Sequence, residues 1–85
     1  MASYKLLIKR SAAKELEQLP PKDRKRVATK LQALSSNPRP PGVEKLSGLE
    51  RYRIRQGNYR VLYELDDGTQ TVTVVAIGDR KDVYR

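Results

Sequence analysis

Hydrophobic residues alternate with polar ones near the start of the chain and then change to a helical spacing. In the stretch YKLLIK, Tyr4, Leu6 and Ile8 fall on one side, and this period of two predicts a strand. Ser11 is a candidate N-cap for a short amphipathic helix that ends before Pro20. The apolar positions of this helix, spaced i, i+4 and i+7, are Ala12, Leu16 and Leu19.

A second helix is predicted from Pro21, which suits a first helical position, to about Asn37, where SSNPRPPG forms a stiff loop. Its apolar stripe again has the spacing i, i+4 and i+7 and consists of Val27, Leu31 and Leu34. Its basic residues fall mostly elsewhere, which favours a solvated face with contact to RNA or a ribosome as a secondary role. They are Lys22, Arg24, Lys25, Arg26 and Lys30.

The second half of the chain is typical of a meander of strands. Gly57-Asn58 and Asp67-Gly68 are two-residue hairpin signals between strands predicted at residues 51–56, 59–66 and 69–77. The order β-α-α-β-β-β predicts an α+β fold with two N-terminal helices on one face of a mainly antiparallel four-stranded sheet. A chain of 85 residues has room for a single domain, expected to span residues 1–85.

The two turns fix the expected pairing of the strands. The first pairs Arg55 with Arg60, and the second places Tyr63 against Val72, Val61 against Val74 and Tyr59 against Ala76. One face then carries the predicted core: Tyr52, Ile54, Tyr59, Val61, Tyr63, Val72, Val74 and Ala76. The other carries Arg51, Arg53, Arg55 and Arg60 with Leu62, Glu64, Thr71, Thr73 and Val75. Because no helix remains to cover this second face, it is expected to be open to water.

Four arginines on one sheet face oppose folding. Two unit charges about 5.5 Å apart, as expected for Arg55 and Arg60, repel by roughly 0.8 kcal/mol in water and about 3 kcal/mol at an effective dielectric of 20. Only Glu64, opposite Arg51, is placed to offset a member of the cluster. Arginine forks match phosphate oxygens, so the cluster favours a phosphate ligand over an ordinary cationic face paired with carboxylates.

Composition supports an anionic partner. The net charge is +8 at pH 7, which indicates nucleic acid or an acidic protein. The chain has neither cysteine nor histidine, which excludes disulfides, thiolate metal sites and histidine acid–base chemistry. Its longest apolar run near the N-terminus is too short for a signal peptide or membrane span, so a cytoplasmic protein with no membrane partner is expected.

The C-terminal stretch GDRKDVYR supplies further candidates. Gly78 permits a sharp change of direction, after which Arg80 is placed to return over the arginine face. Tyr84 at its edge either stacks on a base or packs as a hydrophobic plug, and the spacing does not decide between them.

The stretches KLSGLERYRIRQGNYRVLYEL and VVAIGDRKDVYR, with the order of elements, resemble the RelE family of toxins within the RelE/ParE superfamily of type II toxin–antitoxin systems. The resemblance covers nearly the whole chain and implies a RelE-like, microbial ribonuclease-type fold. It implies a metal-independent, cofactor-free endoribonuclease that enters the ribosomal A site and cuts mRNA by attack of a ribose 2′-OH on the adjacent phosphate, which inhibits translation. The implied partners are mRNA, the ribosome and a cognate antitoxin with an acidic segment, through which the complex contacts operon DNA.

The same resemblance implies roles for individual residues. Arg53 and Arg55 match the basic pair on the first hairpin strand, Arg60 matches the arginine that stabilises charge at the scissile phosphate, and Arg80 and Tyr84 match the C-terminal arginine and tyrosine. The tyrosine favours the RNA-cutting branch over the gyrase-poisoning branch. Further RNA contacts are expected from Arg51, Lys81 and Arg85.

One departure concerns the proton acceptor. Arg53 and Arg55 stand where the best-studied family pattern has lysines, and an arginine hardly gives up its proton. Lys81, Tyr84 and a group on the ribosome are the alternatives for the base, and positioning with electrostatic stabilisation is a further route to catalysis. Two other functions stay open: a gyrase-inhibiting toxin and a non-catalytic RNA- or ribosome-binding module.

Overall fold

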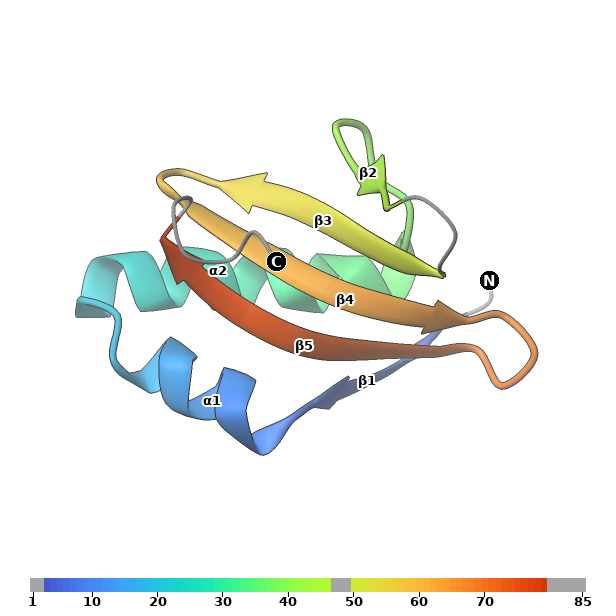
Figure 1. Ribbon diagram of the computed structural model, residues 1–85, viewed down its shortest axis with the longest axis horizontal. Coiled ribbons are helices and arrows are strands. Elements are labelled where there is room, and N and C mark those ends of the chain that lie inside the picture. Colours follow the sequence, from blue (N-terminus) through green and yellow to red (C-terminus); the bar gives the residue numbers. More distant parts are fainter. Residues whose placement is uncertain (1–2, 47–49, 80–85) are drawn as a thin grey trace.

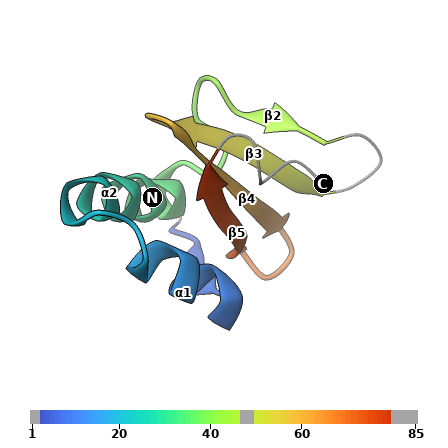
Figure 2. The ribbon, with the colours of Figure 1, turned by 60° about the vertical axis from the view of Figure 1, so that its left-hand side comes forward.

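The computed structural model describes residues 3–46 and 50–79, which form two helices on one face of a five-stranded sheet (Figures 1 and 2). The elements in chain order are β1 (Lys5–Ile8), α1 (Arg10–Glu17), α2 (Pro21–Ser36), β2 (Glu44–Lys45), β3 (Arg51–Gln56), β4 (Tyr59–Asp66) and β5 (Thr71–Asp79). The α+β class and the helical layer are therefore as predicted, whereas the number of strands is not.

The predicted four-stranded sheet is wrong by one strand. Strand β2 is only two residues long and pairs antiparallel with β3, as Glu44 with Arg53 and Lys45 with Tyr52. The sheet order is β1-β5-β4-β3-β2, with β1 parallel to β5 and the other neighbours antiparallel. Two residues are too few to show a period of two, so this edge strand left no pattern in the sequence.

Both helices begin and end close to the expected residues. Helix α2 has Pro21 in its first turn and buries Val27, Leu31 and Leu34, as predicted. Ser11 is not the N-cap of α1: that position is Lys9, whose extended backbone (φ −63°, ψ 150°) leads directly from β1 into the helix. The Ala13 amide donates to the Lys9 carbonyl at 2.9 Å, so α1 begins before the serine.

The first hairpin has the predicted register. Gly57 has a φ of 61°, which suits the first central residue of a type II′ turn, and Arg55 lies opposite Arg60. The predicted second hairpin is wrong, because residues 67–70 form a longer turn in which Gln70 takes a left-handed φ of 53°. The observed pairs are Tyr63 with Val74, Val61 with Ile77 and Tyr59 with Asp79, in place of Val72, Val74 and Ala76.

An irregularity in the β4–β5 pairing changes which residue of β5 faces the core. The register shifts between Leu62 and Tyr63, so that Val74 pairs with Tyr63 while Ala76 pairs with Leu62. Ile77 consequently turns inward and is buried, whereas Ala76, predicted to be in the core, lies on the opposite face with Leu62. Tyr63 pairs with Val74, two residues further along β5 than the predicted Val72. Because side chains alternate with a period of two, a shift of two residues leaves the other side chains on the faces predicted for them.

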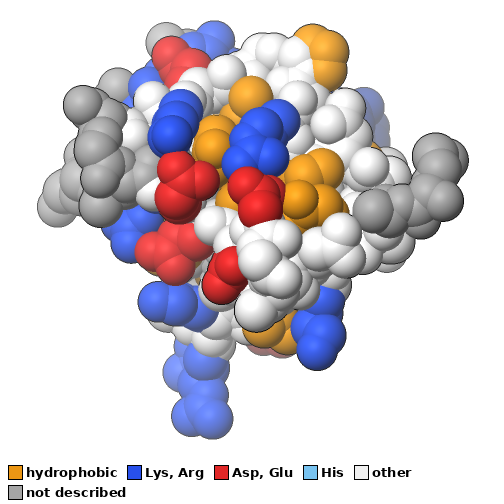
Figure 3. All heavy atoms as spheres, turned by 90° about the vertical axis from the view of Figure 1, so that its right-hand side faces the viewer, with side chains coloured by type: hydrophobic (Ala, Val, Ile, Leu, Met, Phe, Trp, Pro, Cys, Tyr) orange, Lys and Arg blue, Asp and Glu red, His pale blue; other side chains and the backbone are white. Residues whose placement is uncertain are grey.

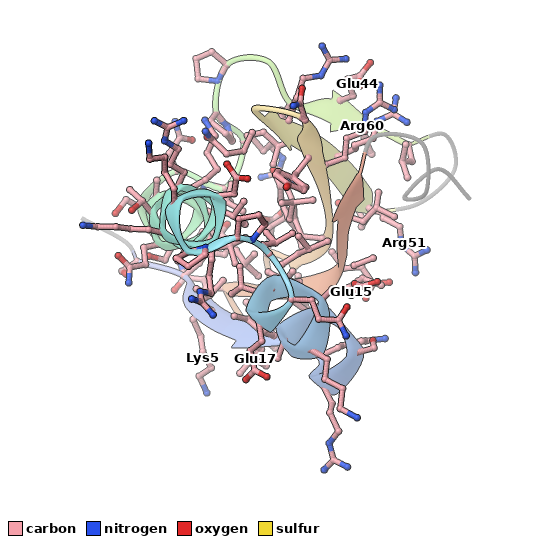
Figure 4. All side chains as sticks on the ribbon, turned by 90° about the vertical axis from the view of Figure 1, so that its left-hand side faces the viewer. Lys5, Glu15, Glu17, Glu44, Arg51 and Arg60 are labelled. Atoms are coloured by element: carbon pink, nitrogen blue, oxygen red, sulfur yellow. The ribbon has the colours of Figure 1, made fainter. Side chains whose placement is uncertain are left out.

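The hydrophobic core fills the space between the helices and the sheet. It consists of Ala12, Val27, Leu31, Leu34, Tyr52, Ile54, Val61, Tyr63, Leu65, Val72, Val74 and Ile77. At the outer edge of β5, beyond the last residue paired with β1, the Ile77 amide donates to the Glu15 carboxylate of α1 at 2.8 Å (Figure 4). This bond satisfies a backbone donor that the short β1 leaves uncovered. Neither α1 nor α2 is long and apolar enough to cross a membrane.

Candidate nucleic-acid interface

The alternating arginines of β3 lie on the sheet face away from the helices, as predicted. Arg51, Arg53 and Arg55 occupy every second position of β3, and Arg60 follows on β4 directly opposite Arg55. In Figure 4, the labelled Arg51 and Arg60 extend from the side of the sheet opposite to α1 and α2. The type II′ turn thus places two arginine side chains of like charge next to each other.

The arginines of this row line two separate hollows. The basic hollow, with a volume of about 380 Å³, is lined by Lys30, Pro41, Gly42, Glu44, Arg53, Ile54, Arg55 and Arg60. It lies at the start of β2, beside the part of β3 beyond Arg53 with which β2 does not pair. A left-handed φ of 88° at Gly42 helps the preceding loop turn into β2, which brings Glu44 alongside Arg53. The hollow is therefore formed by three segments that are far apart in sequence.

Arg51 belongs to a different hollow. This second hollow, called the acidic hollow, has a volume of about 580 Å³. Its lining residues are Glu50, Arg51, Glu64, Leu65, Asp66, Asp67, Thr69, Thr71 and Thr73. Figure 3 shows acidic side chains gathered at this end of the molecule. Arg51 Nη2 donates to Glu64 Oε2 at 2.6 Å, so the offsetting pair predicted from the register does form. An RNA phosphate would be repelled by the other carboxylates here, and the larger hollow is the poorer candidate for RNA.

Arg53 is buried and its charge is paired with a carboxylate, contrary to expectation. Only 10% of its side chain is exposed, and both Nε and Nη2 donate to Glu44 Oε1, at 3.1 and 2.9 Å. The prediction that Glu64 alone could offset the cluster is therefore wrong. Burial explains the pairing, because a buried guanidinium without a counter-ion would be strongly destabilising.

The arginine face is also less exposed than predicted. Leu62, expected on an uncovered face, is only 6% exposed. Of the four arginines, Arg55 is the exposed one and Arg60 is half-buried. Arg55 and Arg60 are thus the groups of the basic hollow best placed to meet a phosphate, with Arg53 beneath Glu44.

Lys30 joins the basic hollow from α2. The sequence placed it on a solvated helix face with RNA contact as a secondary role, and the structure puts it beside the arginines of the sheet. Its position depends on how α2 crosses the sheet, which a helical pattern alone does not reveal. Among the residues that the structure describes, four cations and one carboxylate line this hollow.

Arg80, Lys81, Tyr84 and Arg85 lie outside the described residues. Their assignments as catalytic or RNA-binding groups stay predictions from the sequence.

A second polar cluster holds together the opposite end of the molecule. Asp67 accepts hydrogen bonds from Arg39 Nη2 at 2.9 Å and from the Tyr4 hydroxyl at 2.7 Å, and Arg39 Nε donates to the Tyr52 hydroxyl at 3.1 Å. The guanidinium of Arg39 lowers the pKa of Asp67, while Asp67 raises the pKa of Tyr4. Burial raises the pKa of Tyr63, whose hydroxyl donates to the Pro38 carbonyl at 2.7 Å. These bonds tie the loop after α2 to the sheet and take no part in the basic hollow.

The family of the chain follows from its sequence and fold together. A sequence model of the ParE toxin of type II toxin–antitoxin systems (parDE) matches residues 6–84. The chain belongs to this toxin family. The RelE/ParE superfamily inferred from the arginine-rich hairpin is thereby confirmed.

Named relatives in this superfamily are RelE toxins. Toxin RelE of Mycobacterium tuberculosis is 34% identical over 84 residues, which cover 96% of this chain and 87% of the relative. A putative RelE-like toxin protein of Escherichia coli is 30% identical over 86 residues, which cover 95% of this chain and 90% of the relative. The toxin fold seen in the archaeal RelE–RelB complex of Pyrococcus horikoshii matches with a TM-score of 0.85 and 28% identity, covering 95% of this chain and 99% of that one.

Proposed function

We propose that this member of the RelE/ParE superfamily acts as a toxin that cuts mRNA in the ribosomal A site and so inhibits translation. The observation that carries the proposal is the basic hollow, in which Arg55 and Arg60 stand side by side near Lys30 and Arg53. Like charges are held together there although they oppose folding, and a phosphate would relieve that repulsion.

The reaction proposed is attack of a ribose 2′-OH on the adjacent phosphate. It leaves a 2′,3′-cyclic phosphate and a 5′-OH. Arg55 and Arg60 are assigned to the scissile phosphate, where fixed guanidinium donors stabilise the charge that builds up on the phosphoryl oxygens. Arg80 and Tyr84 are proposed to close the site from the C-terminal segment, with Lys81 and Arg85 contacting RNA, and no step needs a metal ion.

The proposed partners are the ribosome with its mRNA and a cognate antitoxin. The RelE–RelB complex of Pyrococcus horikoshii supports an antitoxin partner, because its toxin chain matches this fold over nearly its whole length. A net charge of +8 favours an antitoxin with an acidic segment. Since ribosomes are the site of action, the protein is proposed to work in the cytoplasm.

Mapping mRNA 5′ ends after induction of the protein in cells tests the proposal. We expect codon-phased cuts in translated messages, lost on Arg60→Ala and weakened on Tyr84→Phe, with Lys5→Ala at an exposed position of β1 as the control. Intact mRNA during growth arrest by the wild-type chain would contradict it.

Inhibition of DNA gyrase is a second candidate, favoured by the match to the ParE toxin. It predicts DNA breaks and an SOS response with mRNA intact, so the same induced cells distinguish the two. Salt-sensitive RNA binding with neither mRNA cleavage nor DNA breaks would instead indicate a non-catalytic binding module.

A further inference from the structure

The basic hollow contains a carboxylate that sequence reasoning did not assign to the site. We propose, building on the proposed RNA cleavage, that Glu44 is the base that takes the proton from the attacking 2′-OH. The sequence left this base open among Lys81, Tyr84 and a ribosomal group, because arginines stand at positions 53 and 55.

The position of Glu44 is fixed by the sheet. Glu44 on β2 lies directly opposite Arg53 on β3, and Nε and Nη2 of Arg53 donate to the same oxygen, Oε1. The side chain of Glu44 is 62% exposed, in contrast to the buried Arg53 beneath it. Arg53 therefore holds a carboxylate that is still exposed and that lines the hollow. In Figure 4, Glu44 lies at the same end of the sheet as Arg60 and apart from Arg51.

The chemistry of the lining residues points to the same group. The guanidinium groups of Arg53, Arg55 and Arg60 and the ammonium group of Lys30 are hydrogen-bond donors that offer no acceptor for a proton. Glu44 is the carboxylate among the described residues that line the hollow, and a carboxylate is an acceptor suited to the role of general base. Arg53 is accordingly a positioning residue for the base and not a phosphate ligand, which accounts for an arginine where a proton acceptor was expected.

The 2′-O–H bond breaks, and its proton passes to Glu44. The 2′-oxygen forms a bond to phosphorus while Arg55 and Arg60 hold the phosphoryl oxygens. The bond from phosphorus to the 5′-oxygen breaks, its electron pair stays on that oxygen, and the oxygen takes a proton from water. Glu44 later returns its proton to solvent.

The test compares single-turnover mRNA cleavage on purified, programmed ribosomes for the wild type, Glu44→Gln and Glu44→Ala. Glu50→Gln and Glu50→Ala are the matched controls, because Glu50 is also exposed but lines the acidic hollow. We expect Glu44→Gln, which keeps an oxygen for Arg53, to cleave at least about 100-fold more slowly, the usual contribution of a general base. Ribosome binding, measured by co-sedimentation, should be as tight as in the wild type or tighter, since a negative charge is removed.

Added formate separates a base from a structural counter-ion. It should restore cleavage by Glu44→Ala in a concentration-dependent way and leave Glu50→Ala unchanged. Cleavage by a folded Glu44→Gln at or above the wild-type rate would overturn the assignment and leave the proposed function intact, with Glu44 serving only as a counter-ion. A slow Glu44→Ala that formate does not rescue would overturn it too. A wild type that does not cleave would overturn the proposed function and this inference with it.

Discussion

Arg55 and Arg60 face each other directly across the β3–β4 hairpin, one pair of residues away from its turn. Both side chains carry a positive charge, and like charges directly opposite each other in a sheet repel, so their proximity is a cost to folding. The other two arginines of the row, Arg51 and Arg53, pair with Glu64 and Glu44. A phosphate held by both guanidinium groups would lower the repulsion between them.

Removing one charge of this pair should make the protein more stable and less active. Arg55→Gln should raise the free energy of unfolding by about 0.2–1 kcal/mol, because like charges directly opposite each other in a sheet destabilise it. The gain should shrink in high salt. Urea unfolding at low and high ionic strength measures it, and Lys25→Gln, an equal charge change on α2, controls for net charge. An Arg55→Gln chain less stable than the wild type at low salt would show that the pair is not strained.

The salt dependence of RNA binding should show whether Arg55 contacts a phosphate. Each cation that neutralises a phosphate of single-stranded RNA contributes about −0.7 to the slope of log K against log salt. Arg55→Ala should therefore make the slope shallower by about 0.7. Titration of a labelled single-stranded RNA over a range of salt concentrations measures it, and Arg51→Ala, paired with Glu64 in the acidic hollow, should change the slope less. Equal changes in the two variants would place RNA along the whole arginine row.

Acid should weaken the cluster formed by Arg39, Asp67 and Tyr4. Because Arg39 lowers the pKa of Asp67 in the folded state, the stabilisation by Asp67 is complete well above its unfolded pKa of about 3.9 and is lost as the pH falls through the lower folded value. Asp67→Asn should lower the melting temperature at pH 7, and its difference from the wild type should shrink as the pH falls below about 3.9. Glu17→Gln on α1 is the control, and a constant difference between Asp67→Asn and wild type across this range would rule out the linkage.

The irregular pairing of β4 and β5 buries Ile77, so truncating this side chain should lower the free energy of unfolding. Ile77 is 1% exposed and Ile8 is 37% exposed, so the same truncation should have unequal costs. Ile77→Ala should lower the free energy of unfolding by about 2–5 kcal/mol, as for other buried aliphatic residues, and Ile8→Ala by clearly less. Chemical denaturation of both variants measures the difference. Similar losses would place Ile77 outside the core.

The sequence predicted the parts of the fold that depend on local patterns. The apolar spacing in α2 and the Gly57-Asn58 turn were sufficient to predict the helix and the opposition of Arg55 and Arg60. The turn at residues 67–70 was misjudged because Asp67-Gly68 resembles a two-residue loop, whereas Gln70 unexpectedly adopts a left-handed conformation. The inward position of Ile77 arises from an irregularity that alternation alone cannot reveal.

The candidate site was predicted only in part, since it depends on contacts between distant segments. The arginines were visible as a period-two row, but Glu44 lies in a two-residue strand after a proline-rich loop and Lys30 lies on a helix. Neither residue has a local signal that joins it to the row. Their place in the basic hollow follows from the packing of α2 and the edge pairing of β2.

The basic hollow is proposed to cut mRNA on the ribosome. The most direct test of this proposal is to add the purified protein to ribosomes carrying a defined mRNA and to analyse the ends of the RNA fragments. We expect A-site cleavage that yields 2′,3′-cyclic phosphate and 5′-OH ends. A 2′-deoxy nucleotide at the cut should abolish this cleavage, and Arg60→Ala should lower it sharply. Uncut mRNA with the wild-type protein, or equal cleavage by Arg60→Ala, would contradict it.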